Sequence, residues 1–155
     1  MNQTNLPTAS PLEAHLGFWL RFVSNHVSGR FQALLEDRAI SITEWVALRT
    51  LYEQNGTSHS ELIQKLGMTK GAASKVITRL EEKGLAERRL VDGRAREQLL
   101  VLTAAGQQLV PELAALADEN DAYFLGHLSE PERATLMAQL QEIVRIHQLK
   151  SLPVD

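Results

Sequence analysis

The sequence predicts a mainly α-helical fold with a single β-hairpin, and three observations support this expectation. Apolar residues recur every three to four positions along most of the 155-residue chain, which is the helical period. Asp92-Gly93 stands between residues 85–91 and 94–102, and this dipeptide favours a two-residue hairpin turn. Two short helices are predicted directly before that hairpin. We therefore expect about six helices and one hairpin.

The two short helices begin and end with recognisable signals. Ser58-His59-Ser60-Glu61 has the spacing of a capping box, which predicts a helix start. Gly67 can adopt the positive φ of a tight helix exit, and Thr69 is a good N-cap for the next helix. Helices joined by about four residues have helix-turn-helix spacing, so this stretch and the hairpin together predict a winged helix-turn-helix.

The second short helix has an outer surface suited to DNA. Ala73, Val76, Ile77 and Leu80 fall on one apolar arc when residues are placed at steps of about 100°. The outward face of its first two turns is then small, hydroxylated or cationic, as an element that enters a major groove must be. A solvated amphipathic helix is the alternative interpretation. The candidate DNA contacts are Thr69, Lys70, Gly71, Ala72, Ser74, Lys75, Thr78 and Arg79.

The predicted hairpin is basic near its tip. Gly84 can end the preceding helix in a left-handed conformation, and the strands around Asp92-Gly93 carry arginines. Cations at the tip of a hairpin can lie along phosphates and reach a narrow minor groove. We therefore predict a wing whose candidate DNA contacts are Arg88, Arg94 and Arg96.

The distribution of charge supports a nucleic-acid partner although the total does not. The chain has a net charge of −3, but residues 70–96 contain eight cations and four acids, a net charge of +4. The remainder therefore carries −7. A basic footprint on an acidic body directs DNA to one face of the protein.

These segments carry a family resemblance. The runs ELIQKLGMTKGAASKVITRLEEKGLAERR, DGRAREQLLVLTAAG and LSEPERATLMAQLQEI resemble, in this order and spacing, the MarR family of bacterial transcription regulators over roughly residues 12–150. The family spacing places the wing arginine at Arg96, whereas Arg94 lies beside the predicted turn and occupies the family's aspartate position. Which of the two enters the minor groove stays open.

The chain divides into three regions on this interpretation. Residues 1–11 are polar and contain two prolines, so we expect a flexible tail. Residues 12–38 and 104–150 form helices whose apolar faces are wider than packing against one neighbour requires, which predicts a dimerisation region. Residues 39–103 form the DNA-binding region.

Three local features are expected within the long helices. Thr43 is predicted to be the N-cap of the helix that contains Trp45. Ser129 and Glu132 have the spacing of a second capping box. Pro111 lies inside the helical pattern after Thr103, so we expect a kink or a helix restart there.

A ligand site is the least direct prediction. His15 and Trp19 are expected to approach Trp45 and Arg49, where the first helix meets the helix that supports the helix-turn-helix from behind. The family resemblance implies that this junction binds small aromatic or phenolic acids. The alternative is that both tryptophans are ordinary core residues.

Other classes of function lack their motifs. The absence of cysteine excludes disulfides, thiol redox switching and cysteine-ligated zinc. No two of the five histidines are three to five residues apart, although a composite metal site with His127 and His147 stays an alternative. No phosphate loop or catalytic triad is evident, so we expect neither an enzyme nor a cofactor. No signal peptide or apolar run of roughly 18 residues is present, so a cytoplasmic protein without a membrane partner is expected.

The sequence as a whole predicts a regulator that binds a pseudo-palindromic double-stranded DNA operator as a homodimer. Together with the resemblance, it favours a repressor that a small ligand releases. An effector-independent or architectural DNA-binding protein and a metal-dependent sensor are the alternatives.

Overall fold

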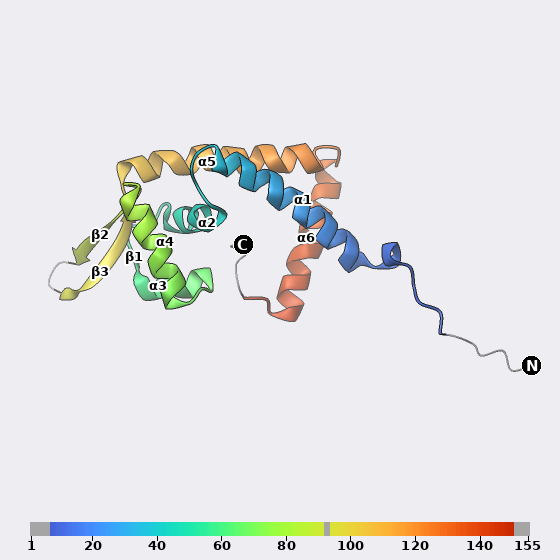
Figure 1. Cartoon of the computed structure of the whole chain (residues 1–155), viewed down its shortest axis with the longest axis horizontal. Coiled ribbons are helices and arrows are strands. Elements are labelled where there is room, and N and C mark those ends of the chain that lie inside the picture. The colour runs from blue at the N-terminus through green and yellow to red at the C-terminus, as the bar shows by residue number, and fades with distance from the viewer. Residues whose placement is uncertain (1–6, 92–93, 151–155) are drawn as a thin grey trace, which may run out of the picture.

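The computed structural model of the chain describes residues 7–91 and 94–150, and only the backbone of residues 91 and 94–97. The fold is mainly α-helical, as predicted, and Figure 1 shows its elements. In chain order they are η1 (Leu12–Ala14), α1 (Leu16–Glu36), α2 (Ile42–Leu51), β1 (Thr57–Ser58), α3 (His59–Leu66), α4 (Lys70–Glu82), β2 (Ala86–Val91), β3 (Arg94–Leu102), α5 (Ala104–Leu125) and α6 (Glu130–His147).

The elements form a compact lobe and a helical arm. Helices α2, α3 and α4 gather with the three strands at one end, and α5 runs from this lobe to the far end of the molecule (Figure 1). Helix α1 packs along α5, and α6 turns away from the end of α5. No helix within the described ranges is long and apolar enough to cross a membrane.

The contact between α1 and α5 contains a buried polar link. Asn120 is 3% exposed, its Nδ2 donates to the Val27 carbonyl at 3.0 Å, and its Oδ1 accepts from Arg30 Nη1 at 3.0 Å. The Arg30 guanidinium also lies 4.1 Å from the centroid of the Tyr123 ring. Because a buried amide is costly unless both its ends are bonded, this arrangement holds the two helices in one register.

The lobe contains the hydrophobic core. The predicted apolar arc of α4 is confirmed, since Ala73, Val76, Ile77 and Leu80 are all less than 5% exposed. Val76, Ile77 and Leu80 pack in one cluster with buried residues of α2, α3, α5 and the sheet. Helix α4 is therefore held on one side only, and its opposite face is left to solvent.

Several helix ends follow the predicted chemistry. Thr69 Oγ1 accepts from the Ala72 N–H at 3.2 Å, and Ser58 Oγ accepts from the Glu61 N–H at 3.1 Å. Both halves of the capping box at Ser129 are present. The hydrogen bonds from the Ser129 side chain and backbone hold the pKa of the Glu132 carboxyl below its ordinary value.

One predicted helix cap is wrong, and one of the two alternatives expected at Pro111 does not occur. Ser41, not Thr43, is the N-cap of α2, because its extended backbone lets Ser41 Oγ accept from the Glu44 N–H at 3.1 Å. Helix α5 also does not restart at Pro111. Proline removes only one backbone bond, and the buried Val110 and Leu113, which precede and follow it in the sequence, hold this part of the helix against the core.

The sheet contains one strand more than expected. Strand β2 pairs antiparallel with β3, from Ala86 opposite Leu102 to Leu90 opposite Gln98, and β1 adds to the other edge of β3. The two-residue strand β1 is too short to give a sequence pattern. The turn residues Asp92 and Gly93 lie outside the described residues.

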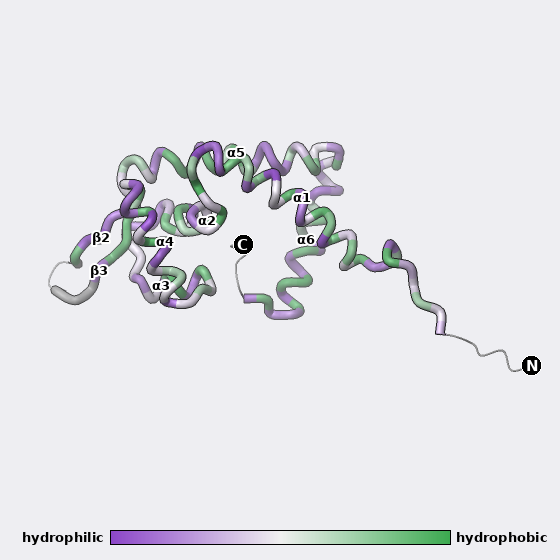
Figure 2. Tube along the Cα trace, in the orientation of Figure 1, coloured by the Kyte–Doolittle hydropathy of each residue, from purple (hydrophilic) through white to green (hydrophobic). Residues whose placement is uncertain are grey.

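The arm carries a large exposed apolar surface. Helix α6 buries none of its residues, and the N-terminal half of α1 also contains no buried residue. Figure 2 shows that hydrophobic residues occur along both helices. We call the apolar residues of α6 the arm face. They are Leu136, Met137, Leu140, Ile143, Val144 and Ile146, between 38% and 58% exposed.

Candidate nucleic-acid interface

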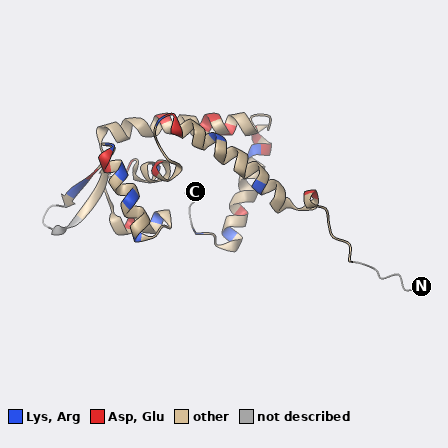
Figure 3. Ribbon diagram, viewed as in Figure 1, with Lys and Arg blue, Asp and Glu red and all other residues tan. Residues whose placement is uncertain are grey.

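The exposed side of α4 is cationic and shallowly hollowed. Lys75, Thr78 and Arg79 are exposed there, and with Ser74 and Glu82 they line a groove of about 340 Å³. Figure 3 shows lysine and arginine following α4 on this side of the lobe. Within the described residues, Lys75 and Arg79 form no ion pair with an acid. Their charges are therefore available to an anionic partner.

The N-terminal end of α4 is open for close approach. Thr69, Lys70 and Gly71 are exposed, whereas Ala72 is half-buried. A Cβ placed on Gly71 would meet no atom within 4 Å, so the backbone there is uncovered. The Thr69 hydroxyl already accepts the capping bond.

The hydroxyl groups of Ser74 and Thr78 on α4 both donate hydrogen bonds within the helix. Ser74 Oγ donates to the Lys70 carbonyl at 2.9 Å, and Thr78 Oγ1 donates to the Ser74 carbonyl at 2.9 Å. His59 Nε2 lies 3.4 Å from Ser74 Oγ. Because each hydroxyl proton is used within the helix, the oxygens face a partner as hydrogen-bond acceptors.

Arg88 has a structural partner. Its Nε lies 2.9 Å from Glu81 Oε1 of α4, so this predicted DNA contact joins the wing to α4. Arg88 is opposite the buried Leu100, whereas Arg89 is opposite Leu99 and its side chain is 65% exposed. Arg89 is the more accessible of the two, although its Nη2 also lies 2.7 Å from Glu87 Oε1 of the same strand.

Arg94 and Arg96 belong to β3, but their side chains lie outside the described part of the chain.

At the base of the hairpin, hydrogen bonds of Thr103 hold the end of β3 in place. The Thr103 N–H donates to the Leu85 carbonyl at 3.0 Å, and Thr103 Oγ1 donates to the Gly84 carbonyl at 2.6 Å. The base of the wing is therefore fixed to the end of α4.

The same hydroxyl of Thr103 accepts from the Gly106 N–H at 3.2 Å as the N-cap of α5. The Leu85 carbonyl leaves no room for a side chain at Gly106, since a Cβ there would lie 2.2 Å from the oxygen. No pattern in the sequence predicts this close approach.

The four predicted ligand residues do not converge within one chain. The Trp45 ring contacts Phe31, with centroids 6.3 Å apart, and packs on the core. Trp19 is 47% exposed, and its indole N–H donates to the Glu13 carbonyl at 2.9 Å. Twelve helical residues separate Trp19 from Phe31, a distance of about 18 Å.

The other two members lie apart as well. A ring nitrogen of His15 lies 3.2 Å from Ser10 Oγ, and the Arg49 guanidinium lies 5.3 Å from the centroid of the Tyr52 ring. The interpretation of Trp45 as a core residue therefore fits the single chain.

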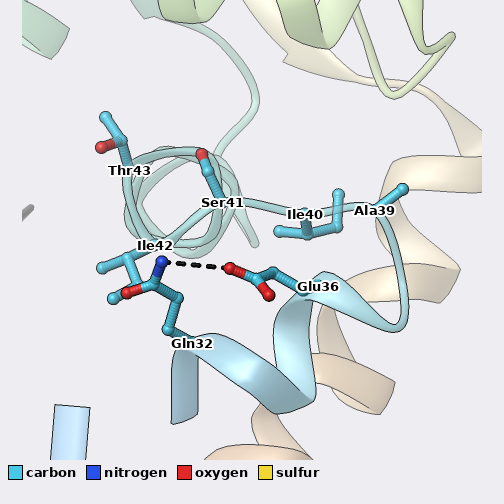
Figure 4. A pocket seen from close by; sticks show the side chains of 7 residues that line it. All are labelled: Gln32, Glu36, Ala39, Ile40, Ser41, Ile42 and Thr43. Atoms are coloured by element: carbon cyan, nitrogen blue, oxygen red, sulfur yellow. Dashed lines mark hydrogen bonds between the residues drawn. The ribbon is translucent and has the colours of Figure 1, made fainter. Parts of the chain in front are cut away.

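A cavity that the sequence did not indicate lies at the turn between α1 and α2. Its volume is about 460 Å³, and Figure 4 shows its lining residues, among which Gln32 Nε2 donates to Glu36 Oε1 at 3.1 Å. The lining residues are Gln32, Glu36, Ala39, Ile40, Ser41, Ile42 and Thr43. Among the described residues, no three histidine, aspartate or glutamate side chains gather as metal ligands.

Comparison with known proteins identifies the architecture. The MarR family profile matches residues 40–92, from the start of α2 to the wing. The HTH-type transcriptional repressor Rv2887 of Mycobacterium tuberculosis is 28% identical over 131 residues, which cover 84% of this chain and 94% of that protein.

Two solved structures share the fold. CouR from Rhodococcus jostii RHA1, bound to p-coumaroyl-CoA, superposes with a TM-score of 0.75 at 22% identity and covers 87% of this chain and 95% of its own. The MepR–DNA complex of Staphylococcus aureus superposes with a TM-score of 0.72 at 23% identity and covers 84% and 97%. The winged lobe, the helical arm and these similarities agree: the chain has the fold of winged helix-turn-helix regulators, and its residues 40–92 match the MarR family model.

Proposed function

We propose that this protein is a homodimeric repressor that binds a pseudo-palindromic operator in double-stranded DNA and is released by a small aromatic or phenolic acid. One observation carries the proposal: the exposed face of α4 presents unpaired cations and acceptor hydroxyls beside a wing. An α-helix with such a face suits a major groove, and the wing suits the adjacent phosphates. The similarity to a named repressor and to a regulator solved with DNA supports it.

The proposed division of labour follows the two parts of the fold. Residues 39–103 would bind DNA, while residues 12–38 and 104–150 would form the dimer. The exposed arm face and the exposed apolar residues of α1 support this division, because a contiguous apolar surface of this kind marks an interaction site. A two-fold dimer would place two copies of α4 in successive major grooves.

Footprinting on the DNA that flanks the protein's own gene tests the function. We expect two symmetric protected half-sites whose centres are about 34–36 Å apart along one face of the duplex. Protection that lacks symmetry, or none beyond that on random DNA, would contradict the proposal.

Lys75→Ala is expected to weaken operator binding by about 1–3 kcal/mol and to leave binding to random DNA nearly unchanged. Lys75 lies in the middle of the exposed face of α4, where a side chain reaches base edges. The measurement is a titration of both DNAs by fluorescence anisotropy, with Lys150→Ala as the control. Equal losses on the two DNAs would make Lys75 a phosphate anchor instead.

Arg94→Ala and Arg96→Ala are expected to act through phosphate charge. Each should reduce the slope of log affinity against log salt by about one for each lost phosphate contact. The slopes would be measured from titrations at several salt concentrations, with Arg133→Ala, in the arm, as the control. Wild-type slopes and affinities in both wing variants would show that the hairpin does not contact DNA.

An aromatic carboxylate is expected to lower operator affinity roughly 5–150-fold, a coupling of about 1–3 kcal/mol. CouR, which is solved with p-coumaroyl-CoA, the thioester of a phenolic acid, supports a phenolic compound as the ligand class. A panel of phenolic and aromatic acids would be titrated while tryptophan fluorescence and operator binding are followed together. Trp19→Phe and Trp45→Phe would assign the fluorescence change to one ring.

The second candidate is a DNA-binding protein without an effector. The separation of Trp19 from Trp45 within one chain favours it, because a ligand between them would need a partner subunit to complete the site. Operator affinity and fluorescence that stay constant across millimolar acids would select this candidate.

A further inference from the structure

The end of α4 is joined to α2 and to the turn before it by one lysine. Lys83 is the C-cap of α4, and its Nζ lies 2.5 Å from Glu44 Oε2 and 2.5 Å from the Ala39 carbonyl oxygen. Glu44 is in the first turn of α2, and Ala39 is in the turn between α1 and α2. A single ammonium group thus bonds two segments about 40 residues earlier in the chain.

The contact between Lys83 and Glu44 involves a buried carboxylate. Glu44 is 4% exposed, and the side chain of Lys83 retains 35% exposure. A buried carboxylate is costly unless it is paired, so Glu44 holds the ammonium in place. The Glu44 N–H is also bonded to the Ser41 hydroxyl, which fixes the residue at the start of its helix.

The turn that supplies the second acceptor is itself constrained. Ala39 has φ of 56°, in the left-handed region that residues with a side chain rarely adopt. The Ala39 N–H donates to the Glu36 carbonyl, and the Ile40 N–H donates to the Leu35 carbonyl. The Ala39 carbonyl is therefore presented to Lys83 by a locally bonded turn.

The geometry of α4 makes its far end sensitive to this contact. The helix has 13 residues and is about 20 Å long. A rotation of about 3° at Lys83 would move its N-terminal end by about 1 Å. Binding groups must be held within about 0.5 Å of their productive positions, so such a rotation would misplace the exposed face of α4.

We infer that Lys83, Glu44 and the Ala39 carbonyl form a clamp that sets the angle of the recognition helix, and that Lys83 governs operator affinity without touching DNA. This inference rests on the proposed function. Lys83 is then a positioning residue, in contrast to Lys75 and Arg79, which carry exposed charge on the same helix.

The test compares four variants of the full-length protein: Lys83→Met, Glu44→Gln, the two combined, and Lys83→Arg. Lys83→Met and Glu44→Gln should each lower operator affinity about 2- to 30-fold while the salt slope stays that of the wild type. The combined variant should bind no more weakly than either single variant, because both changes break one contact. Lys83→Arg should retain affinity, since a guanidinium can bond the same carboxylate.

Lys83→Met leaves Glu44 without its cation, so that variant can lose its fold. The combined variant avoids this, because glutamine and methionine carry no charge, and thermal unfolding would verify that it is folded. A folded combined variant that still binds the operator weakly supports a role in positioning rather than in stability alone.

Two results would overturn the clamp. One is wild-type operator affinity in the folded combined variant. The other is a salt slope reduced by about one in Lys83→Met with no effect of Glu44→Gln, which would make Lys83 a phosphate contact.

Hydrogen exchange of the free proteins separates this inference from the proposed function. Without DNA, Glu44→Gln should speed exchange in residues 70–83 as well as in 39–44, whereas unchanged exchange in 70–83 would also overturn the clamp. Failure of the wild type to bind any operator would contradict the proposed function. The hydrogen-exchange experiment would still test whether the clamp holds α4.

Discussion

Replacing Leu140 with glutamate is expected to dissociate the proposed dimer and to lower operator affinity about 10²–10⁴-fold. Leu140 is 41% exposed in the middle of the arm face, and no residue of α6 is buried within its own chain. A charge there would have to be buried against the apolar surface of a second subunit, which is costly. A single subunit binds only one half-site and loses the gain in affinity from linked binding, which is of order 10²–10⁴.

Sedimentation and operator titration would be run on the same preparations of this variant. Ala138→Glu is the matched control, because it adds the same charge to α6 at an exposed position on the side away from the arm face. We expect the control to remain dimeric. A Leu140→Glu protein that stays dimeric at micromolar concentration would exclude the arm face as the interface.

Leu116 is a less informative position for the same experiment. It is half-buried and packs against the core of the lobe. A charge at Leu116 would therefore affect folding as well as association.

Leu80→Ala is expected to lower the free energy of unfolding by about 2–5 kcal/mol. Leu80 is 0% exposed and lies in the last part of α4, where it joins the recognition helix to the core. Removal of its branched end leaves a cavity among side chains that can relax only partially. Because α4 is held by this one face, operator binding should weaken in parallel.

Leu90→Ala provides the matched control, because Leu90 is 66% exposed in β2. Its effect should stay within about 0.5 kcal/mol. Urea unfolding of both variants would be compared at one protein concentration, since association contributes to apparent stability. A similar loss in the two variants would show that α4 is not held by the core in this way.

Local chemistry explains which parts of the fold were predictable. The caps at Ser58, Thr69 and Ser129 depend on residues three positions apart, so the sequence contains them. Ser41 and Thr43 are both good caps, and the choice between them depends on where the backbone of the α1–α2 turn becomes helical. Strand β1 exists only because β3 lies beside it, which no short-range pattern encodes.

For the candidate interface, the sequence predicted only which face of α4 is buried and which is exposed. Helical period separates the buried Ile77 from the exposed Lys75, and the structure agrees with that separation. The pairing of Arg88 with Glu81 and of Lys83 with Glu44 depends on how elements pack in three dimensions. The sequence therefore identified the cations but not which of them are occupied by acids.

The full exposure of α6 has a consequence for the lifetime of the protein. Most of the stability of a helix in a protein comes from tertiary packing, and α6 buries no residue within its own chain, so α6 should fray whenever the proposed dimer dissociates. Frayed segments are the sites that proteases cut first. Degradation should therefore begin within residues 130–147 and should accelerate as the protein is diluted, which would make the turnover of this regulator depend on its own abundance.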